Sequence, residues 1–291
     1  MPREISFTIE KEQNGLSVKA VLTSVLRLSR HEISRLKFAE NGITLNGRQV
    51  RTNQTVSSGD ILSICFPEKP QETVSASFVP EILYEDEDMI IVNKPAGIVS
   101  HPSHGHLEDD MGTALRAYLK EKAGAVRAVG RLDKDVSGIV VYAKNQPACA
   151  RLSAQRNSGI LRKSYLAAAE GIPEQPAGTI RCFLGKTEGK KAREITESGK
   201  ECVTDYRLLE THGEISLLEV TIRTGRTHQI RASFASAGHP LAGDALYGGS
   251  TDRIQRPALH CASLQCRQPF TGEAITVSVP LPEDIRHLCE V

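Results

Sequence analysis

Residues 130–143 read Gly-Arg-Leu-Asp-Lys-Asp-Val-Ser-Gly-Ile-Val-Val-Tyr-Ala, a polar segment that runs directly into an apolar one. The apolar half, Ile139–Ala143, has the length and the β-branched content of a buried strand. Asp133, with Arg131 and Lys134 close by, lies where the chain would enter that strand and is expected to stay ionised. Such a carboxylate can serve as a nucleophile, a base or a magnesium ligand, and the plain alternative is a polar turn before a strand.

Two groupings near this stretch raise the question of a metal. Asp135 follows Asp133 by two positions, but alternate residues of an extended chain point in opposite directions, so the pair is not expected to share an ion. His101, His104 and His106 lie close together, yet they lack both a fourth ligand and a helical spacing, which favours a loop over a zinc site. We therefore predict no bound metal.

Short β-rich segments surround the opening stretch and mix irregularly with helical patterns. The expected strands are Met89–Val92, Ile139–Ala143, Tyr165–Ala169, Leu217–Ile222 and Ile275–Val279, and the expected helices are Thr113–Lys122 and Thr227–Ala237. This irregular order predicts an α+β fold and not an alternating parallel sheet. Neither a G-x-G-x-x-G motif nor a Walker motif is present, so no nucleotide cofactor is expected.

Three further polar clusters could carry chemistry. The segment Thr224–Arg231 places Arg226 directly after a glycine turn at a helix start, where a guanidinium suits a carboxylate or a phosphate. His228 in the same segment, taken alone, is more often a hydrogen-bonded structural residue than a catalyst. Asn93–Gly97 and His239–Gly248 are the other two clusters, and both are rich in turn-forming residues.

Residues 15–66 predict a separate small module of two helices and a hairpin. Apolar residues recur at helical spacing in the first helix, and Ser29 with Glu32 forms a capping box that begins the second. Asn41-Gly42 is expected to end that second helix, and Asn46-Gly47 predicts a two-residue hairpin.

The charges of this module are uneven. Between residues 27 and 51 there are six Arg and Lys residues against Glu32 and Glu40. A solvated helix face is the plain explanation, and a surface for nucleic-acid phosphates is the functional one. The six basic residues are Arg27, Arg30, Arg35, Lys37, Arg48 and Arg51.

The whole chain of 291 residues carries a net charge of only +1, from 36 basic and 35 acidic side chains. This sum does not exclude a nucleic-acid partner, because it does not locate the charges. Basic residues gather in Arg27–Arg51, around Arg131 and Lys134, in Lys186–Arg193 and in Arg223–Arg231, while acidic residues concentrate elsewhere. We therefore expect a basic track from the N-terminal module into a cleft.

Other features predict an ordinary cytoplasmic protein. No segment approaches eighteen consecutive apolar residues, and the first residues lack an apolar signal region. The seven cysteines are scattered, which favours free thiols in a reducing compartment. A monomer is the expected oligomeric state.

The order of elements in the N-terminal module resembles the alpha-L RNA-binding module first named in a ribosomal small-subunit protein. The resemblance is carried by Leu28-Ser29-Arg30 with the helix after it, by Asn41–Gly47 and by Ser58-Gly59-Asp60. It departs at Leu16-Ser17-Val18, where the family often has Arg-Leu-Asp. The resemblance implies RNA binding through residues of the basic surface. These are Arg27, Arg30, Arg35, Lys37 and Arg48.

The clusters of the longer part resemble, in their order, the RluA-type pseudouridine synthases. The motifs are Asn93–Gly97, Arg131–Asp135 with Ser137-Gly138, Lys163-Ser164-Tyr165, Gly225–Arg231 and His239–Asp244. The resemblance spans residues 81–282 and implies a mixed, largely antiparallel sheet. The implied organisation is an alpha-L module at residues 1–66, a linker at residues 67–80 that contains three prolines, and a catalytic domain at residues 81–291.

The resemblance also implies a chemistry: isomerisation of uridine to pseudouridine in RNA, without a cofactor. Asp133 matches the catalytic aspartate that attacks the flipped target uridine, at the base or at the ribose. Arg226 matches the arginine that pairs with this aspartate, and Tyr165 matches the aromatic residue that lies on the base. Substrate contacts are expected from the remaining polar residues of the same motifs, namely Arg131, Lys163, His228, Gln229 and Arg231.

Some positions depart from the family pattern, and other functions stay open. Gly130 stands where a His often precedes Arg131, and Val136, Ala232 and Ser233 replace other common residues, which puts finer loop contacts in doubt. The alternatives are a catalytically idle RNA-binding homologue and a carboxylate glycosidase or nucleosidase. The mechanism of the latter generally needs a second carboxylate, which no pattern identifies. Large-subunit ribosomal RNA is the expected substrate, with transfer RNA as the alternative.

Overall fold

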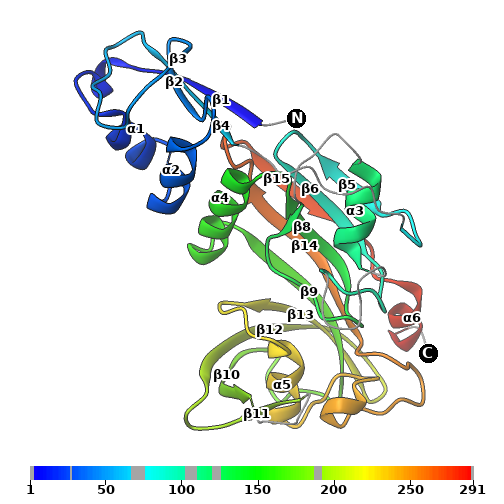
Figure 1. The fold of residues 1–291 in the computed structure, drawn as a ribbon. Helices are drawn as coiled ribbons and strands as arrows, with labels where there is room; N and C mark the ends of the chain where they lie inside the picture. Colours follow the sequence, from blue (N-terminus) through cyan, green and yellow to red (C-terminus); the bar gives the residue numbers. More distant parts are fainter. Residues whose placement is uncertain are drawn as a thin grey trace.

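In the computed structural model, the described residues are 3–26, 28–66, 76–101, 110–119, 126–186 and 192–289. They form two sheets (Figure 1). Arg27 and residues 67–75 of the expected linker lie outside these ranges, as do His104 and His106. None of the described helices is long and apolar enough to cross a membrane.

The N-terminal module has a four-stranded sheet of its own, in the order β1-β4-β2-β3. Its apolar core is separate from that of the longer part and includes Val21, Leu22, Ile33 and Leu36. Its elements are β1 (Arg3–Thr8), α1 (Val18–Ser24), α2 (Arg30–Lys37), β2 (Ile43–Leu45), β3 (Arg48–Gln49) and β4 (Ile61–Phe66).

Local sequence signals place these elements. Ser29 and Glu32 form the predicted capping box, with Glu32 N–H donating to Ser29 Oγ at 3.2 Å and Ser29 N–H to Glu32 Oε2 at 2.7 Å. Asn46 and Gly47 both have positive φ, as the predicted tight hairpin between β2 and β3 requires. Helix α2 ends earlier than predicted, with Phe38 as its C-cap.

The longer part is built on a second sheet, whose described strands number eleven. All of its strand pairs are antiparallel except β8 with β14, so the predicted mixed, largely antiparallel α+β sheet is confirmed. The strands are β5 (Glu81–Glu85), β6 (Met89–Lys94), β7 (Arg127–Ala128), β8 (Ser137–Ala143), β9 (Arg162–Glu170), β10 (Ala177–Lys186), β11 (Arg193–Ile195), β12 (Lys200–His212), β13 (Ile215–Ile222), β14 (Leu259–Arg267) and β15 (Ala274–Ser278).

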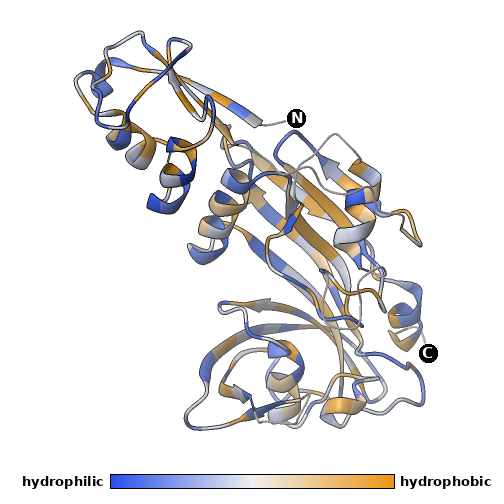
Figure 2. Ribbon diagram, viewed as in Figure 1, coloured by the Kyte–Doolittle hydropathy of each residue, from blue (hydrophilic) through white to orange (hydrophobic). Residues whose placement is uncertain are grey.

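Four helices accompany this sheet: α3 (Met111–Leu119), α4 (Gln146–Asn157), α5 (Gln229–Ser236) and α6 (Glu283–Arg286). The N-terminal module lies beside α4 at one end, and α5 lies with β10–β12 at the other (Figure 1). Apolar residues are concentrated on the central strands, whereas α2 is largely hydrophilic on its visible side (Figure 2). The core of the sheet includes every residue of Ile139–Ala143, as expected for a buried strand.

The close pairing of β8 with β14 depends on a glycine. Gly138 has φ +111°, and a Cβ at this position would collide with the backbone oxygen of Cys261. Only glycine therefore allows β14 to lie against the first residues of β8. Because the Asp133 loop leads directly into β8, this pairing fixes where the loop begins to enter the sheet.

Candidate active site

The Asp133 loop runs from β7 to β8 and is anchored by buried groups. Leu132 and Val136, on either side of Asp133, are 6% and 2% exposed. Ser100 Oγ accepts from Leu132 N–H at 3.1 Å and donates to Leu132 O at 2.9 Å. These contacts leave the Asp133 side chain 20% exposed at the surface of a cleft.

Lys94, in the Asn93–Gly97 motif, fastens the other side of the loop. Its fully buried ammonium group donates to the backbone oxygens of Pro95, Ile98 and Lys134 at 2.9, 2.7 and 3.0 Å. Burial lowers the pKa of Lys94 to about 7, against the opposing effect of Asp135 and Asp133. This motif therefore positions the residue next to Asp133 and does not face the cleft itself.

The cation beside Asp133 is Arg231, from the first turn of α5. Arg231 Nη1 lies 3.5 Å from Asp133 Oδ2, while its Nε and Nη2 donate to the two carboxylate oxygens of Asp244 at 2.6 and 2.7 Å. Arg231 is 8% exposed and Asp244 is 1% exposed. Burial opposes the charge of Arg231, but Asp244 outweighs this effect and the pKa of Arg231 is raised. Asp244 thus holds a permanent cation against Asp133.

The predicted pairing of Arg226 with Asp133 is wrong. Arg226 is exposed in the loop before α5, and it forms no ion pair with any residue that the structure describes. His228 has φ 57°, a left-handed conformation that turns the chain into the helix after Arg226. The turn places Arg231 on the buried side of α5 and leaves Arg226 at the rim of the cleft.

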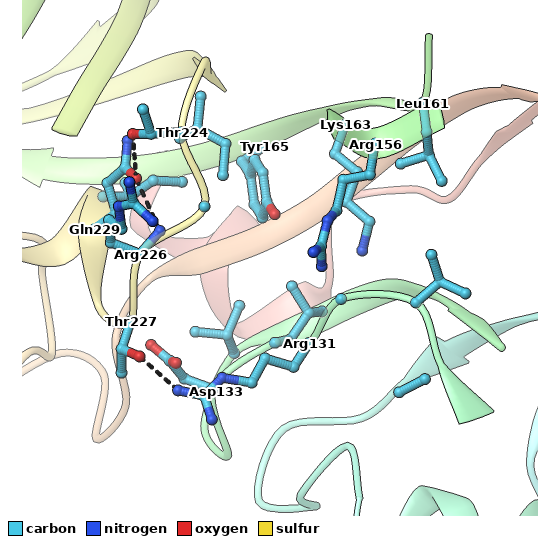
Figure 3. A pocket seen from close by; sticks show the side chains of 18 of the residues that line it. Arg131, Asp133, Arg156, Leu161, Lys163, Tyr165, Thr224, Arg226, Thr227 and Gln229 are labelled. Carbon is cyan, nitrogen blue, oxygen red and sulfur yellow. Dashed lines mark hydrogen bonds between the residues drawn. The ribbon is translucent and has the colours of Figure 1, made fainter. Parts of the chain in front are cut away.

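Tyr165 faces Asp133 across the cleft (Figure 3). It lies in the middle of β9, paired with Val220 of β13 and Cys261 of β14, and is 6% exposed. Burial raises the pKa of Tyr165 well above its usual value, and the negative charge of Asp133 adds to the effect. The ring is therefore a neutral, rigid wall against which a planar base can lie.

His228 contacts both Asp133 and a second tyrosine. Its Nε2 lies 3.8 Å from Asp133 Oδ2, and its Nδ1 lies 3.1 Å from the hydroxyl of Tyr247. Burial lowers the pKa of His228, so the ring is neutral near pH 7. The Tyr247 hydroxyl accepts from Arg193 N–H at 2.7 Å and can give its own proton to His228 Nδ1; in that tautomer the proton of His228 lies on Nε2, toward Asp133.

Three other predicted substrate residues have defined partners. Arg131 Nη2 donates to Thr227 Oγ1 at 2.6 Å and so connects the Asp133 loop to the loop before α5 (Figure 3). Lys163 Nζ donates to Ile139 O at 2.9 Å along the cleft wall, and burial lowers the pKa of Lys163.

Gln229 is the third, and it is saturated by protein groups. Its Oε1 accepts from Thr224 Oγ1 and Arg226 N–H, and its Nε2 donates to Val203 O and Thr204 Oγ1. All four hydrogen-bonding positions of its amide are thereby used, so Gln229 positions the loop before α5, and its contact with the substrate stays a prediction.

The cleft around these residues has a volume of about 1370 Å³. Asp133 is the one carboxylate among its described lining residues, against eight Arg and Lys residues. Three of these, Arg127 of β7, Arg156 of α4 and Arg162 of β9, were not predicted from the sequence. The eight are Arg127, Arg131, Arg156, Arg162, Lys163, Arg223, Arg226 and Arg231.

Comparison with known proteins identifies the kind of enzyme to which this cleft belongs. The family described as RNA pseudouridylate synthase matches residues 88–236, and the RluD ribosomal pseudouridine synthase N-terminal domain matches residues 5–62. The chain is 36% identical to the Bacillus subtilis protein named "Uncharacterized RNA pseudouridine synthase YhcT", over 99% of this chain and 97% of that protein. The chain belongs to the RNA pseudouridine synthases.

Further similarities agree with this assignment and with the predicted RluA type. The synthase is 33% identical to "Ribosomal large subunit pseudouridine synthase D" of Neisseria meningitidis, over 99% of this chain and 81% of that protein. Among solved structures it is similar to "Human RNA Pseudouridylate Synthase Domain Containing 1", with a TM-score of 0.58 and 25% identity over 73% of this chain and 86% of that one. The predicted enzyme class, an isomerase that acts on RNA, is thereby confirmed.

The site of the synthase contains two further residues for which the sequence predicted no role. Asp244 and Tyr247 both come from the cluster His239–Gly248, and both act through residues of the Thr224–Arg231 cluster. The contacts between these two clusters cannot be predicted from a single sequence. Neither the spacing nor the residue types show which arginine forms an ion pair with which carboxylate. In the described part of the synthase, no group of three or more potential metal ligands was found.

The predicted RNA-binding residues of the module are exposed where the structure describes them. Arg30, Arg35 and Lys37 are exposed on α2, and Arg48 is exposed on β3. Arg27 lies outside the described residues. The opposite side of α2 contributes Ile33 and Leu36 to the core of the module, so the basic side is the free side of the helix.

Proposed function

We propose that this synthase converts uridine to pseudouridine in large-subunit ribosomal RNA, with Asp133 as the nucleophile and with the target base flipped into the cleft. The observation that carries the proposal is a single carboxylate, held against a buried arginine and opposite a tyrosine, in a cleft lined by eight Arg and Lys residues. A polyanionic substrate suits the cations, and a flipped uracil suits the space between Asp133 and Tyr165.

The proposed reaction rearranges bonds without gain or loss of atoms. Asp133 attacks the target uridine, and the N-glycosidic bond breaks. The uracil turns within the pocket, and its C5 forms a C–C bond with the ribose carbon that N1 has left. C5 then gives up its proton and N1 takes one up, so the base keeps the same number of atoms. Asp133 departs unchanged, so no cofactor is consumed.

Each neighbouring residue has a separate part in this proposal. Arg231 stabilises the Asp133 carboxylate before attack and after release, because Asp244 keeps it charged and fixed. Tyr165 covers the detached uracil and limits its escape, while His228 offers Nε2–H to Asp133 or to a uracil oxygen. Arg131 must leave Thr227 or move with it when the nucleotide enters, since the two residues meet beside Asp133.

The proposed ribosomal substrate is supported by the N-terminal module and by the relatives. The module matches a domain named for a ribosomal pseudouridine synthase, and a relative that covers 99% of the chain is named for the large ribosomal subunit. The test is pseudouridine mapping by carbodiimide-based primer extension in cells with and without the gene. Loss of a signal in large-subunit RNA supports the proposal, whereas loss only in transfer RNA contradicts the substrate.

The nucleophile is tested separately with Asp133→Asn. We expect loss of activity by about four orders of magnitude, with folding and RNA affinity nearly unchanged, because the amide keeps the shape but not the nucleophilic charge. Wild-type conversion by the purified variant would contradict the assignment. Release of free uracil by the wild-type enzyme would instead identify a nucleosidase, since a synthase conserves the mass of its RNA.

A further inference from the structure

Phe38, at the end of α2, is the most exposed aromatic residue of the described chain. Its side chain is 84% exposed, whereas Phe183 and Tyr118, the other exposed aromatic residues of the described chain, are 47% and 44% exposed. An isolated apolar residue at a surface needs no explanation in general. The position of this ring outside the core of the module and the cations around it indicate which kind of partner it contacts.

The outward position of the ring is fixed by the backbone. Phe38 is the C-cap of α2, and its N–H bonds to Arg35 O and Leu36 O. The core of the module is complete without it, because Ile33 and Leu36 supply the buried side of the helix at 5% and 0% exposure. The ring therefore stays available to a partner and is not an alternative core residue.

The surroundings of the ring are cationic. The ammonium group of Lys37 lies 5.7 Å from the ring centroid, and Arg35 is exposed in the same last turn of α2. Gln49 of β3 donates to Ala39 O at 3.5 Å, which brings the strand that carries Arg48 next to the residue after Phe38.

Acidic residues do not neutralise this surface. Within residues 30–51 the carboxylates are Glu32 and Glu40. Glu32 is buried at 5% exposure and bonds to the N-cap of α2, which leaves Glu40 as the exposed one of the two. A second copy of this surface would bring cations against cations, and a purely apolar partner would leave them unpaired. A polyanion that also has flat apolar faces fits both properties.

We propose that Phe38 stacks on an unpaired base of the RNA substrate, next to phosphates held by Lys37, Arg35 and Arg48. The proposal rests on the RNA substrate of the proposed function. It adds to the cleft around Asp133 a second site at which the synthase binds single-stranded RNA. A base that is already paired and stacked in a duplex has no free face for the ring, so the site selects loops and bulges.

The test uses the absence of tryptophan from the chain. Phe38→Trp introduces the protein's single indole at the proposed stacking position, and stacking on a base quenches its fluorescence. The probes are an RNA hairpin with an unpaired loop and a fully paired duplex of equal length. We expect strong quenching by the hairpin, weak quenching by the duplex, and affinity for the hairpin within about twofold of wild type, since Trp also stacks.

The matched control is Tyr118→Trp, which places the single indole at another exposed aromatic position. Tyr118 is on α3, and its hydroxyl donates to Glu85 of β5. Its fluorescence should not change with either RNA. Equal quenching of Phe38→Trp by hairpin and duplex would overturn the proposal. A shift of its emission with protein concentration, in the absence of RNA, would also overturn it, because it would identify a second copy as the partner.

Affinity gives an independent readout. Phe38→Ala should weaken binding of the hairpin by about 5- to 150-fold, the range for loss of one aromatic stacking contact. Phe38→Leu keeps an apolar side chain without a π-face and should remain weak. Wild-type affinity of either variant would overturn the proposal. Conversion of a short, saturating substrate should stay at the wild-type rate, which separates a failure here from a failure at Asp133.

Discussion

The cleft around Asp133 and the basic surface of the N-terminal module both contain arginines that we expect to contact RNA, but the two regions hold these arginines differently. In the cleft, Arg231 is buried, bound to two carboxylates and contributed by a segment 98 residues away from Asp133. On the module, Arg30 and Arg48 are exposed and come from adjacent local elements. A buried, paired cation can stabilise charge at a fixed point, whereas an exposed one can follow a phosphate wherever it lies.

This difference separates the expected effects of substitutions. Changes at the buried pair should alter kcat, because they move or remove charge at the reacting atoms. Changes on the module should alter affinity and its dependence on salt, because they remove phosphate contacts.

The largest effect in this comparison is expected for Arg231→Met. We expect kcat to fall by about 10²–10³-fold, because the Asp133 carboxylate loses its fixed cation. We also expect a loss of stability of about 3–5 kcal/mol, because Asp244 would be left buried without a partner. Single-turnover conversion at saturating protein and denaturant unfolding measure the two effects.

Arg226→Met is the matched control for this prediction. It removes an arginine five positions away that has no ion pair among the described residues. It should leave kcat and stability nearly unchanged and raise KM, as expected for a rim residue. A loss of kcat at Arg226 equal to that at Arg231 would contradict the assignment of the buried pair.

Deleting residues 1–70 should have the next largest effect. The catalytic sheet has its own core, so the remaining chain should fold. We expect binding of a long RNA to weaken by roughly 10²-fold, with little change in the rate on a short substrate, because the module adds a second attachment point. Filter binding and single-turnover assays on both RNAs check this, and equal dissociation constants for the two proteins would refute it.

The two regions also differ in how far the sequence predicts them. The module is specified by signals within a few residues: the capping box of Ser29, the turn at Asn46-Gly47 and the apolar spacing of α1. Strands β6 and β8 can be predicted equally well from the sequence, because each contains a continuous apolar segment. These features depend on neighbours along the chain, so one sequence contains them.

Other elements and the pairing within the site depend on distant contacts. Helix α4 buries only Pro147, Ala148 and Leu152 among its twelve residues, too few for a periodic pattern. Strand β12 is mostly polar, and only three of its thirteen residues are buried. Likewise, Asp133, Tyr165 and His228 line one cleft, but which of two arginines lies beside Asp133 depends on the left-handed turn at His228. That turn has no signature in the residue types alone.

A smaller effect is expected for single charges of the module. Arg48→Ala should weaken RNA binding by a few-fold and lower the slope of log affinity against log salt concentration by about 0.7–0.9, the value for one lost phosphate contact. Titrations at several salt concentrations measure the slope. Arg207→Ala is the control, because Arg207 is exposed but bonded to Glu219 at 2.6 Å. An unchanged slope for Arg48→Ala would place this residue outside the RNA interface.

The smallest effect is expected at a contact between the N-terminal module and the catalytic part of the chain. Arg151 of α4 donates to Leu26 O of the module at 2.8 Å and to Pro269 O at 2.9 Å, while its guanidinium lies 4.3 Å from the Phe270 ring centroid. Arg151 thereby connects the residues just after α1 to the catalytic part of the chain and orients the basic surface relative to the cleft. Leu26 and Pro269 contribute backbone oxygens only, so the contact depends on the arginine.

Arg151→Lys keeps the charge but cannot bridge both oxygens and stack at the same time. We expect both Arg151→Lys and Arg151→Ala to raise KM for a long RNA by about two- to fivefold, since a less fixed module lowers the effective concentration of the second attachment point. The rate on a short RNA should not change. If KM rose equally for long and short RNA, Arg151 would act on the cleft itself, and the two regions would not be joined at this residue in the way the geometry indicates.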